Sequence, residues 1–186
     1  MPCPCREDSL ALLAEYTQGD GLIKHALAVE AAMRAYARRF GEEEHLWAMT
    51  GLLHDLDYER YPTREVHPRH GAEVLTERGY PEELVHAVKA HADYTGVARE
   101  SRLDKALYAV DELSGFVTAC ALVRPGRQLA GLEARSVRKK LKDKAFARCV
   151  SREDIARGAE ELGVDLDEHI TFVIGAMQEI ASELGL

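Results

Sequence analysis

The adjacent pair His54 and Asp55 is the part of the sequence whose side chains best suit metal chemistry. It ends an apolar, helix-forming run over 47–53, where a buried charge is costly unless it is paired or binds a metal ion. Neighbouring residues on a helix point about 100° apart, so one cation at the helix end can contact both side chains. Imidazole and carboxylate together suit Mn, Fe, Co, Ni or Zn. In the alternative interpretation the helix end is exposed, and both side chains simply face water.

Asp111 is a further candidate ligand, because it lies in the middle of an expected helix among residues that otherwise suit a core. It shares one stripe of that helix with positions 104, 108, 115 and 118. Gly115 in this stripe would let another backbone or a ligand approach closely, since glycine has no side chain. Glu112 follows directly, and we expect one of these two adjacent carboxylates to face solvent.

Most of the chain has the apolar spacing, the capping residues and the breaks of a succession of helices. We expect helices over 9–17, 20–40, 42–56, 68–78, 81–91, 102–123 and 136–146, then one capped by Ser151 and Asp154 and a last one capped by Asp165 or Asp167. The segment 58–66 contains Pro62 and is expected to be a loop. Because strand signals are nearly absent, the sequence predicts an all-α fold.

Length, charge and cysteine usage limit the class of function. The chain has 186 residues and a formal net charge of −8, which argues against bulk nucleic-acid binding but not against a small phosphorylated substrate held by a local basic patch. The four cysteines have no paired C-x-x-C spacing, so we expect reduced thiols, with Cys3 and Cys5 in a frayed N-terminus. The sequence has neither a signal-peptide pattern nor an apolar run of membrane-spanning length, so we expect a cytoplasmic protein that does not bind membranes.

The candidate ligands occur in an order that resembles a known family. His25, then His54-Asp55, then His91, then Asp111 reads as H…HD…H…D, which is the ligand order of the HD-domain phosphohydrolase superfamily. The segments GLLHDLDYERYP, HADYTG and KALYAVDELSGFVTACALVRP resemble small bacterial HD or HDIG-type proteins. The likeness continues through SVRKKLKDKAFARCVSREDI and so covers nearly the whole chain.

This resemblance implies a helical bundle with additional C-terminal helices. We assign residues 1–186 to a single HD-type domain, with a core over about 20–124 and a helical extension over about 132–186. The resemblance also implies that one divalent cation is surrounded by His25, His54, Asp55 and Asp111.

A second metal ion is implied by the segment HPRHGAEVL, which is similar to the His-x-x-x-Gly segment of binuclear HD proteins. His67 and His91 would hold this ion, with Asp55 bridging both ions and serving as the catalytic residue, while His70 is the substitute for His67. The expected helices over 68–78 and 81–91 have similar lengths and a short connection, so they should be antiparallel and should bring His67 and His91 to the same end. We therefore predict one or two divalent ions, with Mn, Mg, Fe, Co, Ni and Zn as candidates.

The run after Asp55 differs from that of alarmone hydrolases, and the segment after His91 lacks the signature of cyclic-dinucleotide phosphodiesterases. Asp57 is left open between a group that supports the metal ligands and a loop charge, and Glu59 is interpreted as loop charge. Lys105 is a candidate substrate-binding residue because it precedes Asp111 by less than two helical turns.

A basic run near 135–144 has two interpretations: a solvated helix face, or a rim that attracts phosphate. Lys139 and Lys140 of this run join Lys105 as candidate substrate-binding residues. Three histidines among charged neighbours are expected at the surface: His45, His86 and His169.

Together these observations predict a metal-dependent hydrolase, a phosphatase or phosphodiesterase, that acts on a small phosphorylated compound, with nucleotides among the candidates. Two alternatives stay open, because the same ligands serve di-iron oxygenases of the HD type and because a regulatory module can keep a metal and a ligand pocket without turnover. The sequence does not decide whether the chain forms homo-oligomers.

Overall fold

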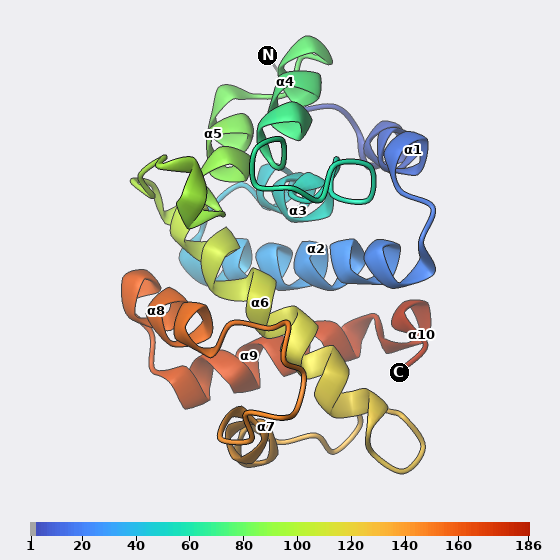
Figure 1. Cartoon of the computed structure of the whole chain (residues 1–186), viewed down its shortest axis with the longest axis vertical. Helices are drawn as coiled ribbons and strands as arrows, with labels where there is room; N and C mark the ends of the chain where they lie inside the picture. Colours follow the sequence, from blue (N-terminus) through green and yellow to red (C-terminus); the bar gives the residue numbers. More distant parts are fainter. Residues whose placement is uncertain (1–2) are drawn as a thin grey trace.

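The computed structural model describes residues 3–186, and within them it consists of α-helices, one short 3-10 helix and connecting turns, with no β-strand (Figure 1). The elements in chain order are α1 (Arg6–Tyr16), α2 (Asp20–Phe40), α3 (Glu44–Leu53), α4 (Arg69–Glu77), α5 (Glu82–Ala90), η1 (Asp93–Thr95), α6 (Arg102–Leu122), α7 (Ala134–Leu141), α8 (Arg152–Leu162), α9 (Leu166–Glu179) and α10 (Ala181–Leu184). The predicted all-α fold is confirmed. None of these helices combines the length and the apolar character that crossing a membrane requires.

Helix α2 crosses the middle of the molecule and lies between two apolar clusters (Figure 1). One cluster is enclosed mainly by α1, α3, α4 and α5, and the other mainly by α2, α6 and the helices that follow. Leu27 of α2 and Leu46 of α3 pack against both clusters. The chain therefore buries apolar surface on both sides of α2, and side chains near its N-terminal end sit between the two halves.

The close crossing of α2 and α3 depends on Gly51. A Cβ atom at this position would lie 2.8 Å from the backbone oxygen of Val29, so only glycine lets the two helices approach this closely. The approach brings the imidazole of His54, directly after α3, next to that of His25 on α2, with ring centroids 5.2 Å apart. The close packing of α2 against α3 thereby positions two of the predicted ligands.

Several helix ends differ from the expected ones. Helix α1 begins at Arg6 with Cys5 as its N-cap, so Cys5 is part of the fold and not of a frayed terminus. Helix α3 ends at Leu53, and the chain continues in turns through 60. Helix α7 ends at Leu141, because the guanidinium of Arg152 donates to backbone oxygens of the following segment and holds it as a folded loop.

The caps of the C-terminal helices are largely as predicted. The Ser151 side chain accepts the Asp154 N–H at 3.2 Å and caps α8, although the Asp154 carboxylate turns to Tyr108 instead of completing the capping box. Asp165, not Asp167, caps α9 by accepting two backbone N–H groups. These caps matter for the site because α8 and the loop before it lie over α6 (Figure 1).

The surface position predicted for His169 is wrong. Its side chain is fully buried between α2, α6 and α9, with Nε2 at 2.9 Å from the backbone oxygen of Ala109 and Nδ1 at 2.6 Å from the Tyr36 hydroxyl. A carbonyl oxygen can only accept, so Nε2 carries the proton and Nδ1 accepts from Tyr36. Burial lowers the pKa of His169 to about 4, so the imidazole is neutral in the folded protein at neutral pH.

We expect this buried histidine to make the fold sensitive to acid. Below the ordinary pKa of about 6.5 the unfolded chain binds a proton that the folded chain refuses until about pH 4, so the free energy of unfolding falls by up to about 1.4 kcal/mol per pH unit in this window. His169→Gln removes this contribution and should flatten the loss of stability between about pH 7 and about pH 5, measured by urea denaturation.

Tyr36→Phe is the matched control for His169→Gln. It removes the hydroxyl that bonds to Nδ1 and should lower stability, but it leaves a buried titratable imidazole and should keep the wild-type pH dependence. All three proteins share the rest of the titrating groups, so these cancel from the comparison. An unchanged slope in His169→Gln would show that His169 does not titrate on unfolding.

Candidate metal centre

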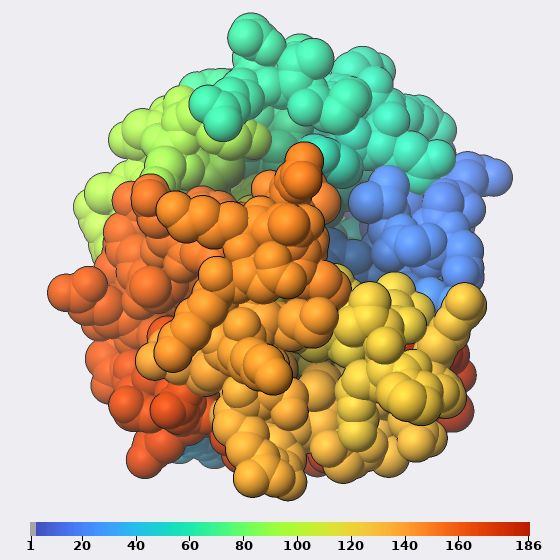
Figure 2. Space-filling view, turned by 60° about the horizontal axis from the view of Figure 1, so that its bottom comes forward, coloured from blue at the N-terminus to red at the C-terminus, as the bar shows by residue number. Residues whose placement is uncertain are grey.

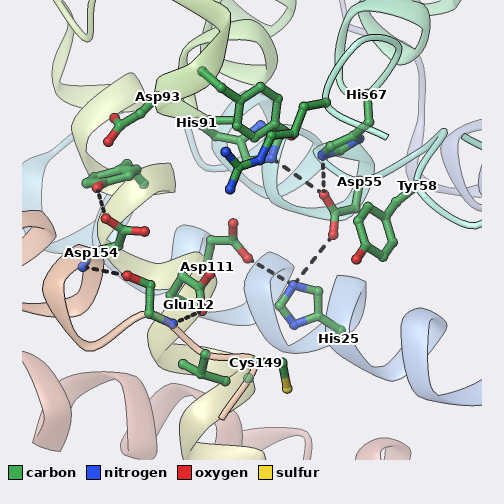
Figure 3. Close-up of a pocket in the computed structure, with 17 residues that line it drawn as sticks. His25, Asp55, Tyr58, His67, His91, Asp93, Asp111, Glu112, Cys149 and Asp154 are labelled. Atoms are coloured by element: carbon green, nitrogen blue, oxygen red, sulfur yellow. Dashed lines mark hydrogen bonds and ion pairs between the residues drawn. The ribbon is translucent and has the colours of Figure 1, made fainter. Parts of the chain in front are cut away.

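Six side chains that the sequence analysis singled out as metal ligands converge from five parts of the chain (Figure 3). They are His25 on α2, His54 and Asp55 directly after α3, His67 before α4, His91 directly after α5, and Asp111 on α6. His67 and His91 come together because α4 and α5 pack against each other with a short connection between them. Their imidazoles lie with ring centroids 5.4 Å apart, as the antiparallel arrangement predicts.

Asp55 lies between two groups of imidazoles, one group at each carboxylate oxygen. Its Oδ2 atom is 3.5 Å from Nε2 of His54 and 4.0 Å from Nε2 of His25. Its Oδ1 atom is 3.4 Å from Nε2 of His67 and 3.5 Å from Nε2 of His91. Each group has the spacing of metal ligands, and a single carboxylate is common to both. A carboxylate placed in this way would suit a bridging role between two cations.

Asp111 adds a second carboxylate to the first group. Its Oδ1 atom is 3.0 Å from Nε2 of His25 and 3.4 Å from Nε2 of His54. The first position is therefore surrounded by His25, His54, Asp55 and Asp111, and the second by Asp55, His67 and His91. Mixed nitrogen and oxygen donors of this kind suit first-row divalent metals.

Three of the four imidazoles, those of His54, His67 and His91, are oriented by a hydrogen bond at Nδ1, which leaves Nε2 facing the cluster as in a metal ligand. Nδ1 of His54 is 2.8 Å from the backbone oxygen of Gly51, and Nδ1 of His91 is 2.6 Å from that of Val88. Because a carbonyl oxygen only accepts, each Nδ1 carries a proton, and Nε2 is left to bind a second proton or a metal ion.

His54 shows most clearly that the residues fit a metal ion. Its side chain is fully buried, and Nε2 has no hydrogen-bond partner within the described part of the chain although it points at two carboxylates. A bare lone pair facing carboxylate oxygens is repulsive, so this arrangement requires either a proton on Nε2 or a metal ion between these atoms. The donors around Nε2 are those that bind divalent cations, so the residues present fit the group that the sequence predicts.

Charge in the cluster leads to the same conclusion. Burial lowers the pKa of His54, but Asp55 and Asp111 raise it further, to about 9 in total. Burial raises the pKa of both carboxyl groups, yet His54 and the other imidazoles bring it below its usual range. Without a metal ion, a proton on His54 therefore supplies the missing positive charge, and metal binding has to displace that proton.

Asp57, which the sequence left open, supports the second group from behind. Its side chain is fully buried, and its two oxygens accept from Nδ1 of His67 at 2.7 Å and from the backbone N–H of Gly71 at 2.8 Å. It thus holds the imidazole of His67 with Nε2 toward Asp55. Glu59 instead accepts the N–H groups of Gln18 and Gly19 at the surface, as a loop charge does.

His70 lies outside the cluster. Its side chain is about one-third exposed and packs edge-on against Tyr61, with ring centroids 4.6 Å apart. His67 lies in the turn before α4 and His70 lies within α4, and their side chains have different surroundings. Of the two alternatives, the structure brings only His67 to Asp55.

A cavity of about 780 Å³ opens onto the ligands, and we call it the metal cavity (Figure 3). Besides the ligands, its wall has tyrosines, carboxylates and the loop before α8: Tyr58, Tyr94, Tyr108, Arg64, Ala92, Asp93, Glu112, Gly115, Cys149, Val150, Ser151 and Asp154. Its size is that of a small-molecule site.

The expectation that either Asp111 or Glu112 faces solvent is wrong, because both line the metal cavity. Glu112 accepts the backbone N–H of Ser151 at 3.1 Å, and burial together with the neighbouring charge of Asp111 raises its pKa to about 7. No local pattern around Glu112 indicates this position, since the loop that covers Glu112 comes from about forty residues further along the chain.

The structure does not bring the three predicted substrate-binding lysines to the metal cavity. Lys105 lies on another side of α6 than Asp111, because six residues turn a helix by about 240°. Lys139 is exposed on α7, and the ammonium of Lys140 lies over the Phe146 ring, 4.6 Å from its centroid. Among residues 3–186, Arg64 is the one arginine or lysine on the cavity wall.

An all-α fold with histidine and aspartate groups that can hold metal ions is the class that these observations define. The family model of the HD domain matches residues 22–115, about half of the chain and a segment that contains all six ligands. The chain belongs to the HD-domain family, whose members are generally metal-dependent phosphohydrolases, and the predicted resemblance is confirmed. Searches among curated proteins and among solved structures found no match.

The bridging geometry predicts two metal ions per chain, and ligand variants test it. His67→Ala should lose one ion, His70→Ala should keep both, and Asp55→Ala should lose most of the metal while helical content survives. Asp57→Asn, which weakens the support of His67, should lower affinity at one position by about 10- to 100-fold. Elemental analysis of protein purified without chelator measures the metal content, and circular dichroism the helices.

Metal content can also contradict the arrangement with two metal ions. If wild-type protein and His67→Ala both hold a single ion, the second group does not bind metal. Full metal content in both His54→Ala and Asp55→Ala would contradict the whole centre.

Proposed function

We propose that the protein is a metal-dependent phosphohydrolase that acts on a small phosphorylated compound, with nucleotides among the candidate substrates. The observation that carries the proposal is the position of Asp55, whose two oxygens face two separate groups of metal-ligand type at the wall of an open cavity. Membership of the HD-domain family supports the same reaction class.

Divalent cations bound by these residues would activate water as a nucleophile and offset negative charge on the phosphoryl group. The protein's own contribution is geometry. Asp55 would offer one oxygen to each group of imidazoles, and Asp57 and the backbone oxygens of Gly51 and Val88 orient the imidazoles before a substrate arrives. Such preorganisation avoids rearrangement during the reaction.

Arg64 is the residue that we assign to the phosphate of the substrate, in place of Lys105, Lys139 and Lys140. It is exposed on the wall of the metal cavity, and its guanidinium lies over the Tyr94 ring, 5.3 Å from the centroid. A guanidinium offers paired N–H donors that match two phosphate oxygens. Because the other charged side chains of the wall are acidic, Arg64 is the natural anchor for an anion there.

Reaction class is tested with a panel of phosphomonoesters and phosphodiesters in the presence of Mn, Mg, Co or Ni. We expect metal-dependent release from at least one compound, lost on chelation and lost in Asp111→Ala. A silent panel together with substrate-dependent oxygen uptake by iron-loaded protein would favour the di-iron oxygenase. A silent panel without oxygen uptake, but with ligand binding, would favour the regulatory module.

The assignment of Arg64 is tested by its alanine variant. Arg64→Ala should raise KM by about tenfold with little change in kcat, since a charge-assisted hydrogen bond contributes about 1.5–3 kcal/mol and is made before and during the reaction. Lys105→Ala is the comparison, because it removes a cation that does not line the cavity wall. A raised KM in Lys105→Ala and an unchanged one in Arg64→Ala would reverse the assignment.

A further inference from the structure

A second cavity lies beside the metal centre, and we call it the side cavity. It has a volume of about 450 Å³ and lies between the start of α2, the end of α6 and the C-terminal residues. Its wall combines apolar side chains, Leu122, Leu184 and Leu186, with two cations, Lys24 and Arg127. In character it thus differs from the metal cavity, whose wall is rich in carboxylates and tyrosines.

The two cavities meet at the metal centre. His25 and Gly115 line both of them, and Nε2 of His25 faces Asp111 at 3.0 Å. Figure 2 shows a hollow bordered by the blue start of α2, the teal segment after α3, the yellow end of α6 and the orange loop before α8. The segment after α3 and the loop before α8 line the metal cavity, and the end of α6 lines the side cavity, so the two cavities adjoin at His25 and Gly115, and we call them together the groove.

Gly115 keeps the junction open. The sequence offered two reasons for a glycine in this helix stripe: the approach of another backbone, or the approach of a ligand. A Cβ atom at Gly115 would meet nothing among the described residues within 4 Å except Nδ1 of His25, at 4.0 Å, which is ordinary contact distance. No backbone requires the glycine, although a glycine inside a helix destabilises it relative to alanine. The approach of a ligand is the reason that remains.

The geometry points to a substrate that fills both cavities. We propose that the protein acts on a phosphodiester, with the phosphorus at the metal centre, one arm in the metal cavity and the other arm, which carries a negative charge, in the side cavity. This inference rests on the proposed phosphohydrolase function. A phosphomonoester has one arm and would leave one cavity unused, whereas the groove provides room on both sides of the ligands.

The reaction would be a hydrolysis. A bond forms between a water oxygen and phosphorus while the bond from phosphorus to the oxygen of one arm breaks. That oxygen leaves with the bonding electron pair and takes up a proton, and the phosphate stays on the other arm. No oxidant, reductant or further reactant is needed.

The charge of the side cavity indicates the charge of its arm. Lys24 pairs with Asp20 at 2.8 Å, and that carboxylate is itself largely exposed, so the pairing is open to competition. Arg127 lies on the wall with its backbone in the left-handed region, at a φ of 48°, which is unfavourable for a residue with a side chain. Two cations face one acidic side chain there, which suits an anionic group next to apolar surface.

Two synthetic diesters test this inference. Both have a p-nitrophenyl arm; the other arm is butyl in one compound and the equally long carboxypropyl in the other. With metal-loaded protein we expect kcat/KM for the carboxypropyl diester to exceed that for the butyl diester by about tenfold, as a charge-assisted contact gives. Arg127→Ala should reduce this preference to about twofold or less, and Arg135→Ala, which removes an exposed arginine from outside both cavities, should keep it.

Gly115→Leu tests the junction, with Gly115→Ala as the smaller step. Calorimetric titration with carboxypropyl phenyl phosphate, whose phenyl arm is a poor leaving group, measures binding without turnover. We expect its Kd to rise by about tenfold or more in Gly115→Leu and by less in Gly115→Ala, with metal content unchanged. If leucine at this position disturbs His25 and metal is lost, Arg127→Ala still decides the question, because Arg127 is not a ligand.

The outcomes separate this inference from the proposed function. Efficient hydrolysis of p-nitrophenyl phosphate, with neither diester cleaved, would overturn the two-armed substrate and leave the phosphohydrolase intact. Equal use of the two diesters, unaffected by Arg127→Ala, would overturn the charged arm. If metal-loaded protein cleaves none of the three compounds and binds none of them, the proposed function falls, and this inference falls with it.

Discussion

The candidate metal centre is arranged around one carboxylate, that of Asp55. Asp55 presents each of its oxygens to a different pair of imidazoles, and Asp111 adds a second carboxylate to one of these pairs. Carboxylates and unprotonated imidazole nitrogens in a largely buried cluster repel unless positive charge lies among them. The fold therefore stabilises a cluster that requires positive charge. The raised pKa of His54 has the same cause, because the carboxylates of Asp55 and Asp111 favour a proton on that imidazole. Helix packing supplies the force that keeps the ligands together.

The segment that matches the HD-domain model and the rest of the chain contribute differently to the site. All six ligands lie within residues 22–115, the segment that the HD-domain model matches. Eight of the twelve other residues that line the metal cavity also lie in this segment, whereas the loop before α8 closes that cavity and the end of α6 with the C-terminal residues forms much of the side cavity. Arg152 holds that loop in place through four of its backbone oxygens, and the bond from the Ser151 N–H to Glu112 joins the loop to the family segment. The proposed metal ligands thus all lie in the family segment, whereas both parts of the chain line the two cavities.

Features of the fold and site that depend on residues close together in the sequence could be predicted, and those that depend on distant residues could not. Helix types and the meeting of His67 with His91 rest on helical spacing and on one short connection, so both could be predicted. The burial of His169 and the cavity position of Glu112 depend on partners more than thirty residues away, which periodicity does not contain. The prediction for Lys105 is wrong for a simpler reason. It rests on the short distance between Lys105 and Asp111 along α6, but six residues also turn the helix by about 240°, to another side.

Charge connects the metal centre to substrate binding. The chain carries a formal net charge of −8, and apart from Arg64 the charged side chains on the wall of the metal cavity that are not metal ligands are acidic. An anionic phosphate would be repelled from such a cavity in the absence of metal. Under the proposed function, bound cations would offset this field beside the ligands, so metal occupancy would set the affinity for the substrate as well as its reactivity. Under the same proposal, the acidic wall would disfavour the binding of phosphate compounds to metal-free protein, which could not convert them.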